Sequence, residues 1–167
     1  MPTTESVRGE LGLASFLPPV RAWFEETFGR PTPPQSKGWP AIQRGEHTLI
    51  LAPTGSGKTL AAFLWGIDRL FRELLAQQEE EESSKRDVED PGGVRIIYIS
   101  PLKALNNDIH RNLRVPLASI RRKAQEMGLD YPEIEVAVRS GDTPRRERQA
   151  MIRKPPHILI TTPESFY

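Results

Sequence analysis

Residues 52–59, APTGSGKT, hold the side chains with the clearest chemical purpose, a lysine and a threonine directly after a glycine-rich turn. The stretch follows the pattern G-x-x-x-x-G-K-[S/T], except that Ala52 replaces the first glycine. In such a turn the backbone N–H groups face inward and cradle the phosphates of a nucleotide. A turn that merely joins a strand to a helix would explain Gly55 and Gly57, but not a lysine at the start of an apolar helix. We therefore predict a nucleoside triphosphate site here.

Each part of this loop has an expected role. Lys58 is expected to reach the β- and γ-phosphates, and the Thr59 hydroxyl is expected to bind Mg²⁺, which makes these two residues the catalytic candidates. The other loop residues are expected to contact the nucleotide as well: Ala52, Pro53, Thr54, Gly55, Ser56 and Gly57.

The loop needs a strand before it and a helix after it, and the surrounding sequence predicts both. HTLILA at 47–52 is the expected strand, and apolar positions after Lys58 keep a 3.6-residue period to about residue 76. Further strands rich in β-branched residues are predicted at 94–100, 134–140 and 157–161. Helices between the strands indicate a parallel sheet with helices on its faces. Ligands bind beyond the carboxyl ends of such strands, so the polar segments that follow all four strands are expected at one edge.

Other segments are expected around this sheet. Residues 1–15 are predicted to be an N-terminal tail, and two short helices are predicted at 16–28 and 34–44. The helix after 94–100 contains Pro116, which is expected to kink or divide it. The highly charged stretch 77–93 is predicted to be a mobile acidic loop.

Composition excludes several classes of protein. The chain has no cysteine, which removes disulfides and thiol catalysis, and its three histidines have no metal-ligand spacing. No apolar run approaches the roughly 18 residues that span a bilayer, and no signal peptide is visible, so we expect a cytoplasmic protein without a membrane partner. The net charge is only +1, but basic residues outnumber acidic ones 13 to seven over 95–154. Such a basic half fits a polyanion, and it also fits ordinary solvated helix surface.

Several segments outside the loop resemble the motifs of superfamily 2 helicases. PTPPQ at 31–35 resembles the Q motif, which implies that Gln35 reads the adenine edge of ATP. SPLKALNNDI, SGDTP and TTPES resemble the strand-end segments that contact the sugar–phosphate backbone of one nucleic-acid strand. The resemblance therefore implies nucleic-acid contacts from these residues: Lys103, Gly141, Asp142, Thr161 and Thr162.

Taken together, these motifs resemble the large helicase-related (Lhr) family over about residues 16–167. The resemblance implies a RecA-like P-loop NTPase domain, a three-layer α/β/α fold with a mainly parallel sheet, here truncated. It also implies an ATP-dependent 3′–5′ DNA helicase, a DNA-dependent ATPase linked to DNA repair, with ATP and Mg²⁺ as cofactors and single-stranded DNA as partner. The remainder of a longer helicase chain is a further expected partner.

The Asp-Glu box of this family has no match here, nor does the arginine finger of a second motor domain. The chain is therefore expected to bind nucleotide and nucleic acid but not to hydrolyse ATP alone. Two alternatives stay open: an RNA helicase or remodeller of the same superfamily, and a nucleotide-binding module that performs no hydrolysis. Ribose contacts separate RNA from DNA, and the sequence does not reveal them.

Overall fold

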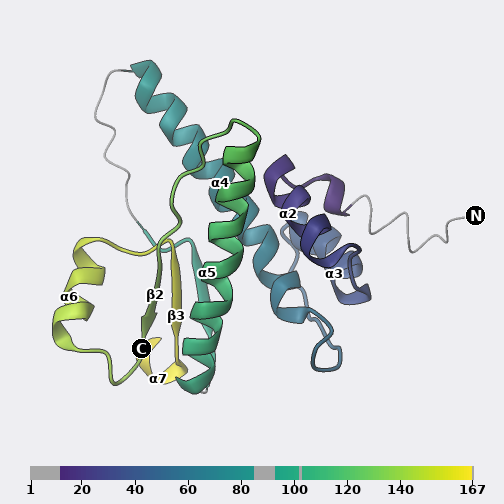
Figure 1. The fold of residues 1–167 in the computed structure, drawn as a ribbon. Helices are drawn as coiled ribbons and strands as arrows, with labels where there is room; N and C mark the ends of the chain where they lie inside the picture. Colours follow the sequence, from purple (N-terminus) through teal and green to yellow (C-terminus); the bar gives the residue numbers. More distant parts are fainter. Residues whose placement is uncertain (1–11, 85–92, 102, 167) are drawn as a thin grey trace, which may run out of the picture. The chain divides into compact units, whose positions relative to one another are not determined.

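The computed structural model describes residues 12–84, 93–101 and 103–166 (Figure 1). These residues form two compact units, and each is described by itself. The first unit takes in the chain up to residue 69 together with 122–130, and the second takes in 70–121 and 131 onward.

The first unit is built from helices packed on aromatic side chains. It contains α2 (Pro18–Phe28), α3 (Pro33–Gln43) and the first part of α4 (Lys58–Ser84). The Trp39 ring is fully buried, its indole N–H donates to the Ala61 carbonyl at 3.1 Å, and the Phe16 ring lies edge-on to it at 5.0 Å. Such contacts bury apolar area at about 25 cal/mol per Å². They fix the N-terminal half of α4 against α3, and the predicted short helices are confirmed.

The prediction of an N-terminal tail over 1–15 is wrong for residues 12–15. Residues 12–14 form a helical turn, and the Leu13 side chain is buried. The Gln43 amide donates to the Gly12 carbonyl at 3.1 Å and to the Ser15 hydroxyl at 2.7 Å. One apolar side chain and these long-range hydrogen bonds therefore attach residues 12–15 to the end of α3. Residues 1–11 lie outside the described part of the chain.

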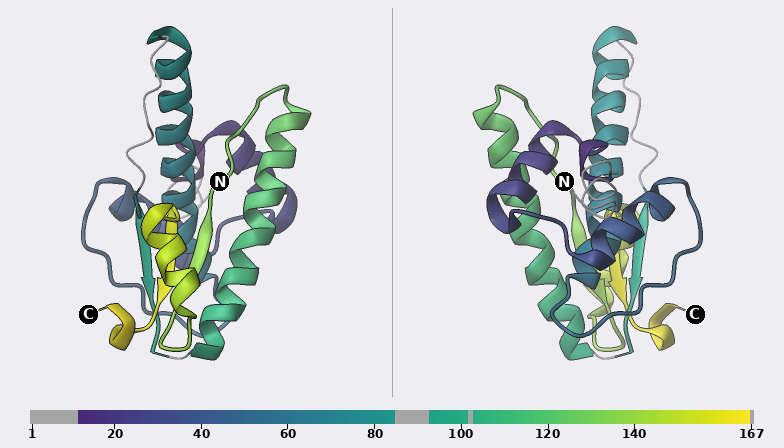
Figure 2. Two further views of the ribbon diagram at one scale, coloured as in Figure 1. Left: turned by 90° about the vertical axis from the view of Figure 1, so that its left-hand side faces the viewer. Right: turned by 90° about the vertical axis from the view of Figure 1, so that its right-hand side faces the viewer.

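The second unit contains a three-stranded parallel sheet in the order β1-β3-β2 (Figure 2). Its strands are β1 (Ile96–Ile99), β2 (Val136–Arg139) and β3 (Ile158–Thr161). All three were predicted from their β-branched composition, so that prediction is confirmed. In the central strand, Ile158, Ile160 and Thr161 are fully buried, as burial on both faces of a parallel sheet requires.

Helices lie on both sides of this sheet. Figure 1 shows α5 (Lys103–Glu126) along one side and α6 (Arg145–Arg153) along the other, with α7 (Pro163–Phe166) after the central strand. This layered α/β arrangement agrees with the predicted fold class. Pro116 lies inside α5, which continues past it, so proline does not divide the helix.

Two further expectations about secondary structure are wrong. Residues 47–52 form no strand, and the side chains of Leu49 and Leu51 are 82% and 84% exposed. A strand exists only through hydrogen bonds to a neighbour, and the three strands of the described sheet do not include this segment. Residues 77–84 are helical rather than a loop. Gln and Glu are good helix formers, and extending an existing helix needs no new nucleus. Residues 85–92 of the predicted acidic loop lie outside the described residues.

Candidate nucleotide and nucleic-acid sites

The glycine loop holds two of its residues in a left-handed backbone conformation. Gly55 and Gly57 have φ angles of 80° and 83°, in the left-handed region that side chains avoid. Helix α4 begins at Lys58, and its first hydrogen bond runs from the Ala61 N–H to the Gly57 carbonyl at 2.9 Å. The positive end of a 27-residue helix therefore follows directly on the loop.

The start of α3 holds this loop in place. The Thr32 hydroxyl donates to the Ser56 carbonyl at 2.8 Å, and the Gln35 amide lies 3.4 Å from the Gly57 carbonyl. Gln35 also accepts a hydrogen bond from the Thr32 N–H at 2.9 Å. A Cβ on Gly57 would lie 2.5 Å from the Gln35 amide nitrogen, so a larger residue would displace the Gln35 side chain or the loop and would also strain the backbone at this positive φ. The contribution of Thr32 was not predicted, because its hydrogen-bond partner lies 24 residues away in the chain.

Gln35 is buried at 3% exposure, with both ends of its side-chain amide engaged. In this arrangement the Gln35 side chain links the start of α3 to the glycine loop at Gly57. Recognition of adenine by Gln35 stays a prediction.

The charged end of Lys58 lies within the loop itself. Its ammonium group donates to the Ala52 and Pro53 carbonyls at 2.5 and 2.7 Å. The Lys58 ammonium group is thus hydrogen-bonded to two neutral carbonyl groups. Negatively charged phosphate oxygens would be stronger partners for it. The Ser56 hydroxyl oxygen is buried and has no hydrogen-bond partner among the described residues, whereas Thr59 is exposed. A loop with an exchangeable cation, an orphaned hydroxyl and an accessible threonine fits a polyphosphate and its Mg²⁺.

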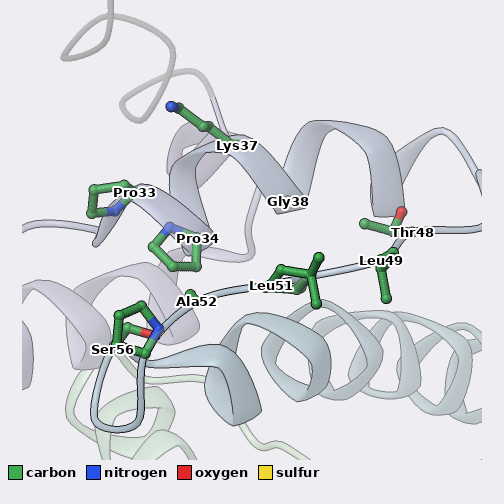
Figure 3. Close-up of a pocket in the computed structure, with 11 residues that line it drawn as sticks. Pro33, Pro34, Lys37, Gly38, Thr48, Leu49, Leu51, Ala52 and Ser56 are labelled. Atoms are coloured by element: carbon green, nitrogen blue, oxygen red, sulfur yellow. The ribbon is translucent and has the colours of Figure 1, made fainter.

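A hollow of about 500 Å³ adjoins the loop (Figure 3). It lies between the first turns of α3, where Figure 3 shows Pro33, Pro34 and Lys37, and the extended segment 48–53. Ser56 lines the hollow but Gln35 does not. The hollow is mainly apolar, as expected for the flat face of a nucleobase or another uncharged ring.

The second unit brings three of the predicted strand-end segments to one edge of the sheet. Ile99 and Arg139 both pair with Thr161, so the three strands end at the same level. The Ser100 N–H donates to the Thr161 carbonyl at 3.0 Å, which extends the ladder to this edge. The fourth segment, the glycine loop, belongs to the first unit, and its gathering with the other three stays a prediction.

The predicted nucleic-acid contacts differ in accessibility. Gly141 and Asp142 are exposed, whereas Thr161 and Thr162 are 0% and 2% exposed. The Thr162 hydroxyl lies 3.2 Å from that of Ser165. The burial of both threonines favours Gly141 and Asp142 as the groups that reach a strand. Lys103 is the first residue of α5, and its side chain lies outside the described part of the chain.

The described residues were also expected to lack a histidine or cysteine metal site and a membrane-spanning segment. No group of histidine, cysteine, aspartate and glutamate side chains is arranged to hold a metal ion among them. Burial and the neighbouring Arg114 lower the pKa of His110, which favours its neutral form. Within the same residues no helix has the length and apolar character needed to cross a bilayer.

The family model for DEAD/DEAH box helicases matches residues 32–167. An Lhr helicase and probable uracil glycosylase of Mycolicibacterium smegmatis is 52% identical over 93% of this chain and 9% of its own length. The Lhr-Core protein 2 of Thermococcus barophilus, an ATP-dependent helicase, is 53% identical over 88% of this chain and 16% of its own length.

A solved structure extends these similarities to three dimensions. The helicase Lhr of Mycobacterium smegmatis, bound to ssDNA and AMP-PNP, superposes with a TM-score of 0.79 and 51% identity. The match covers 92% of this chain and 18% of that one. The chain thus spans less than a fifth of each of these relatives. From the family match, the Lhr-type relatives and the geometry of the glycine loop, we conclude that the chain belongs to the DEAD/DEAH box helicase family.

Proposed function

We propose that this chain is the ATP-binding part of an ATP-dependent 3′–5′ DNA helicase. The observation that carries the proposal is the loop 52–59, with Gly55 and Gly57 in the left-handed region and Lys58 held beside the loop carbonyls. The AMP-PNP in the similar Lhr structure supports a nucleotide at the corresponding place.

Within this site the residues have separate tasks. The loop amides and Lys58 hold the phosphates, after Lys58 exchanges the Ala52 and Pro53 carbonyls for phosphate oxygens. Thr59 offers its exposed hydroxyl to Mg²⁺, which when bound neutralises charge on the phosphates. Thr32 and Gln35 keep the loop in shape, and Gln35 or groups around the neighbouring hollow bind the adenine.

Nucleic-acid binding is the second part of the proposal. The exposed turn at Gly141 and Asp142 contacts the backbone of single-stranded DNA. Lys103, the first residue of α5, contacts the same backbone. The ssDNA in the similar Lhr structure supports this choice. Thr161 and Thr162 contribute through their backbone or after a local rearrangement, because both side chains are buried.

Helicase activity requires these two sites together with further parts of a longer chain. Unwinding, translocation from 3′ to 5′ and a part in DNA repair belong to a motor of which this chain supplies one portion. We place it in the cytoplasm, where ATP and nucleic acid are both found.

Calorimetry with Mg·ATP tests the nucleotide site directly. The unaltered protein is expected to bind Mg·ATP, and Lys58→Ala is expected to weaken binding at least tenfold, about 1.4 kcal/mol. Lys154→Ala is a matched control, because it removes an exposed lysine that pairs with Glu135 and does not line the neighbouring hollow. A folded, unaltered protein that gives no binding heat and protects no residue of 52–59 on addition of nucleotide would refute the proposal.

A further inference from the structure

Arg148 lies in the second turn of α6 and contacts the exposed turn that precedes this helix. Its Nε donates to the Thr143 carbonyl at 2.8 Å, and its Nη2 donates to the Gly141 carbonyl at 2.6 Å. The side chain is half-buried. A cation near the N-terminus of a helix meets an unfavourable dipole, so these two charge-assisted hydrogen bonds offset a local cost.

The turn itself is closed by its own hydrogen bonds. The Thr143 N–H donates to the Ser140 carbonyl at 3.1 Å, which makes residues 140–143 a β-turn. The Ser140 N–H donates to the Thr143 hydroxyl at 2.8 Å. Together with the two bonds from Arg148, these contacts occupy the carbonyls of Ser140, Gly141 and Thr143.

The directions of these carbonyls determine where the amides of the turn point. In a trans peptide the C=O and N–H bonds point in opposite directions. Because the Ser140 carbonyl points across the turn to Thr143, the Gly141 N–H points out of the turn. Because the Gly141 carbonyl points to Arg148, the Asp142 N–H points away from that guanidinium. Both residues are exposed, so these two amides belong to a turn that faces solvent.

We propose that Arg148 is a positioning residue for nucleic-acid binding. It binds the Gly141 and Thr143 carbonyls and thereby holds the Gly141 and Asp142 amides where they can donate to a phosphate of the strand. Arg148 does not itself contact the phosphate. This inference rests on the proposed function of the turn, and it adds a residue that binds two carbonyls of that turn.

The variant Arg148→Met tests this role, because methionine keeps the unbranched stem and helix propensity of the side chain but donates no hydrogen bond. Arg146→Met is the matched control, since Arg146 is an exposed residue of the same helix and loses the same charge. Affinity for a single-stranded DNA oligonucleotide is measured at several salt concentrations. Arg148→Met is expected to bind about tenfold more weakly, the order of change that two lost charge-assisted hydrogen bonds can produce.

The salt dependence separates positioning from direct contact. Loss of one arginine–phosphate contact on a single strand lowers the slope of log K against log salt by about 0.7. If Arg148 acts by positioning, Arg148→Met weakens binding with a slope like that of Arg146→Met. A slope reduced by about 0.7 relative to Arg146→Met would overturn the positioning role in favour of direct contact.

A structural readout keeps the test independent of DNA. Amide exchange at Thr143 is expected to accelerate in Arg148→Met and to stay unchanged in Arg146→Met, while Mg·ATP binding is unaffected in both. Normal DNA binding by Arg148→Met, or unchanged exchange at Thr143, would overturn the role of Arg148 alone. Absence of DNA binding by the unaltered protein would instead overturn the proposed nucleic-acid function, and the role of Arg148 with it.

Discussion

At the scale of single residues, Gly57 is the position where the phosphate loop tolerates least change. Alanine there would take on about 1–2 kcal/mol of left-handed strain. It would also place a Cβ 2.5 Å from the Gln35 amide nitrogen, so either the Gln35 side chain that supports the loop or the loop itself must move. We predict that Gly57→Ala weakens Mg·ATP binding roughly tenfold or more, which corresponds to about 1.4 kcal/mol or more.

A second glycine provides the control for this prediction. Gly45 has a φ of 75° and no atom within 4 Å of an added Cβ. Gly45→Ala therefore carries similar strain without a collision, and it should lower thermal stability while leaving nucleotide affinity intact. Equal losses of affinity in the two variants, measured by calorimetry, would show that general destabilisation is responsible.

Gln35 poses a different question at the same scale, because it supports Gly57 and is also predicted to read adenine. We predict that Gln35→Ala lowers stability by about 1 kcal/mol through loss of buried hydrogen bonds. We also predict that it weakens ATP binding more than pyrophosphate binding. Gln43→Ala is the matched control, since it removes hydrogen bonds to Gly12 and Ser15 at the far end of α3. Parallel losses for ATP and pyrophosphate in Gln35→Ala would show that Gln35 supports the loop and does not read the base.

At the scale of elements, Lys123 joins the last turn of α5 to α2 within the first unit. Its ammonium group lies 2.6 Å from carboxylate oxygens of both Glu126 and Glu26. The hydrogen bond to Lys123 lowers the pKa of Glu126, and the bonds to Glu126 and Glu26 raise the pKa of Lys123. Because the pKa of Glu126 is lowered in the folded state, its ion pair stabilises the fold at pH values above the ordinary pKa of glutamate. That contribution is lost as the pH falls through the folded-state pKa. Because the pKa of Lys123 is raised in the folded state, the ion pairs stabilise the fold at pH values below the ordinary pKa of lysine. That contribution is lost in strong alkali, as the pH rises through the folded-state pKa.

The expected stability difference between Lys123→Met and the unaltered protein is therefore small, because both glutamates are exposed to solvent, and it depends on pH. It should be present near pH 7 and shrink toward about pH 3, where glutamates are protonated. Urea midpoints at the two pH values measure it. Arg122→Met serves as control, because Arg122 lies 3.9 Å from Glu126 at a more exposed position. A difference that is unchanged in acid would rule out the ion pairs as its source.

At the scale of the whole molecule, two units carry two kinds of site. The glycine loop belongs to the first unit, and the edge of the sheet with the turn at Gly141 belongs to the second. The prediction of one RecA-like domain over 16–167 is a statement about how these units combine, and it stays a prediction. A motor couples such sites, so we predict that a full-length helicase carrying this sequence hydrolyses ATP faster with single-stranded DNA than without it.

Matched DNA and RNA oligonucleotides, compared in a steady-state ATPase assay, check this prediction and separate the remaining alternatives. Stimulation by DNA beyond that by RNA is expected, and Lys58→Ala should abolish both. Stronger stimulation by RNA would favour an RNA remodeller, and no stimulation by either strand would favour a nucleotide-binding module.

Much of this protein could be predicted from residues that are close together in the chain. The turn at Gly55 and Gly57, the lysine at the start of α4, and the strands at 96–99, 136–139 and 158–161 depend on local backbone preferences and short-range patterns. Where local patterns were misjudged, the reason is also physical. The glutamates at 79–82 are charged enough for a loop, yet they extend a helix that was already nucleated.

The sequence by itself therefore determined the glycine-rich turn with its lysine and the α/β class of the fold, because both depend on residues that are close together in the chain. Only the tertiary structure decided which side chains hold the site in shape. Thr32 and Gln35 reach Ser56 and Gly57 across more than 20 residues of chain. Thr161 and Thr162 are buried, and residues 47–52 form no strand within the described part of the chain, although their composition led us to expect one. Burial, strand pairing and long-range hydrogen bonds depend on groups distant in the chain, and no local pattern encodes their meeting.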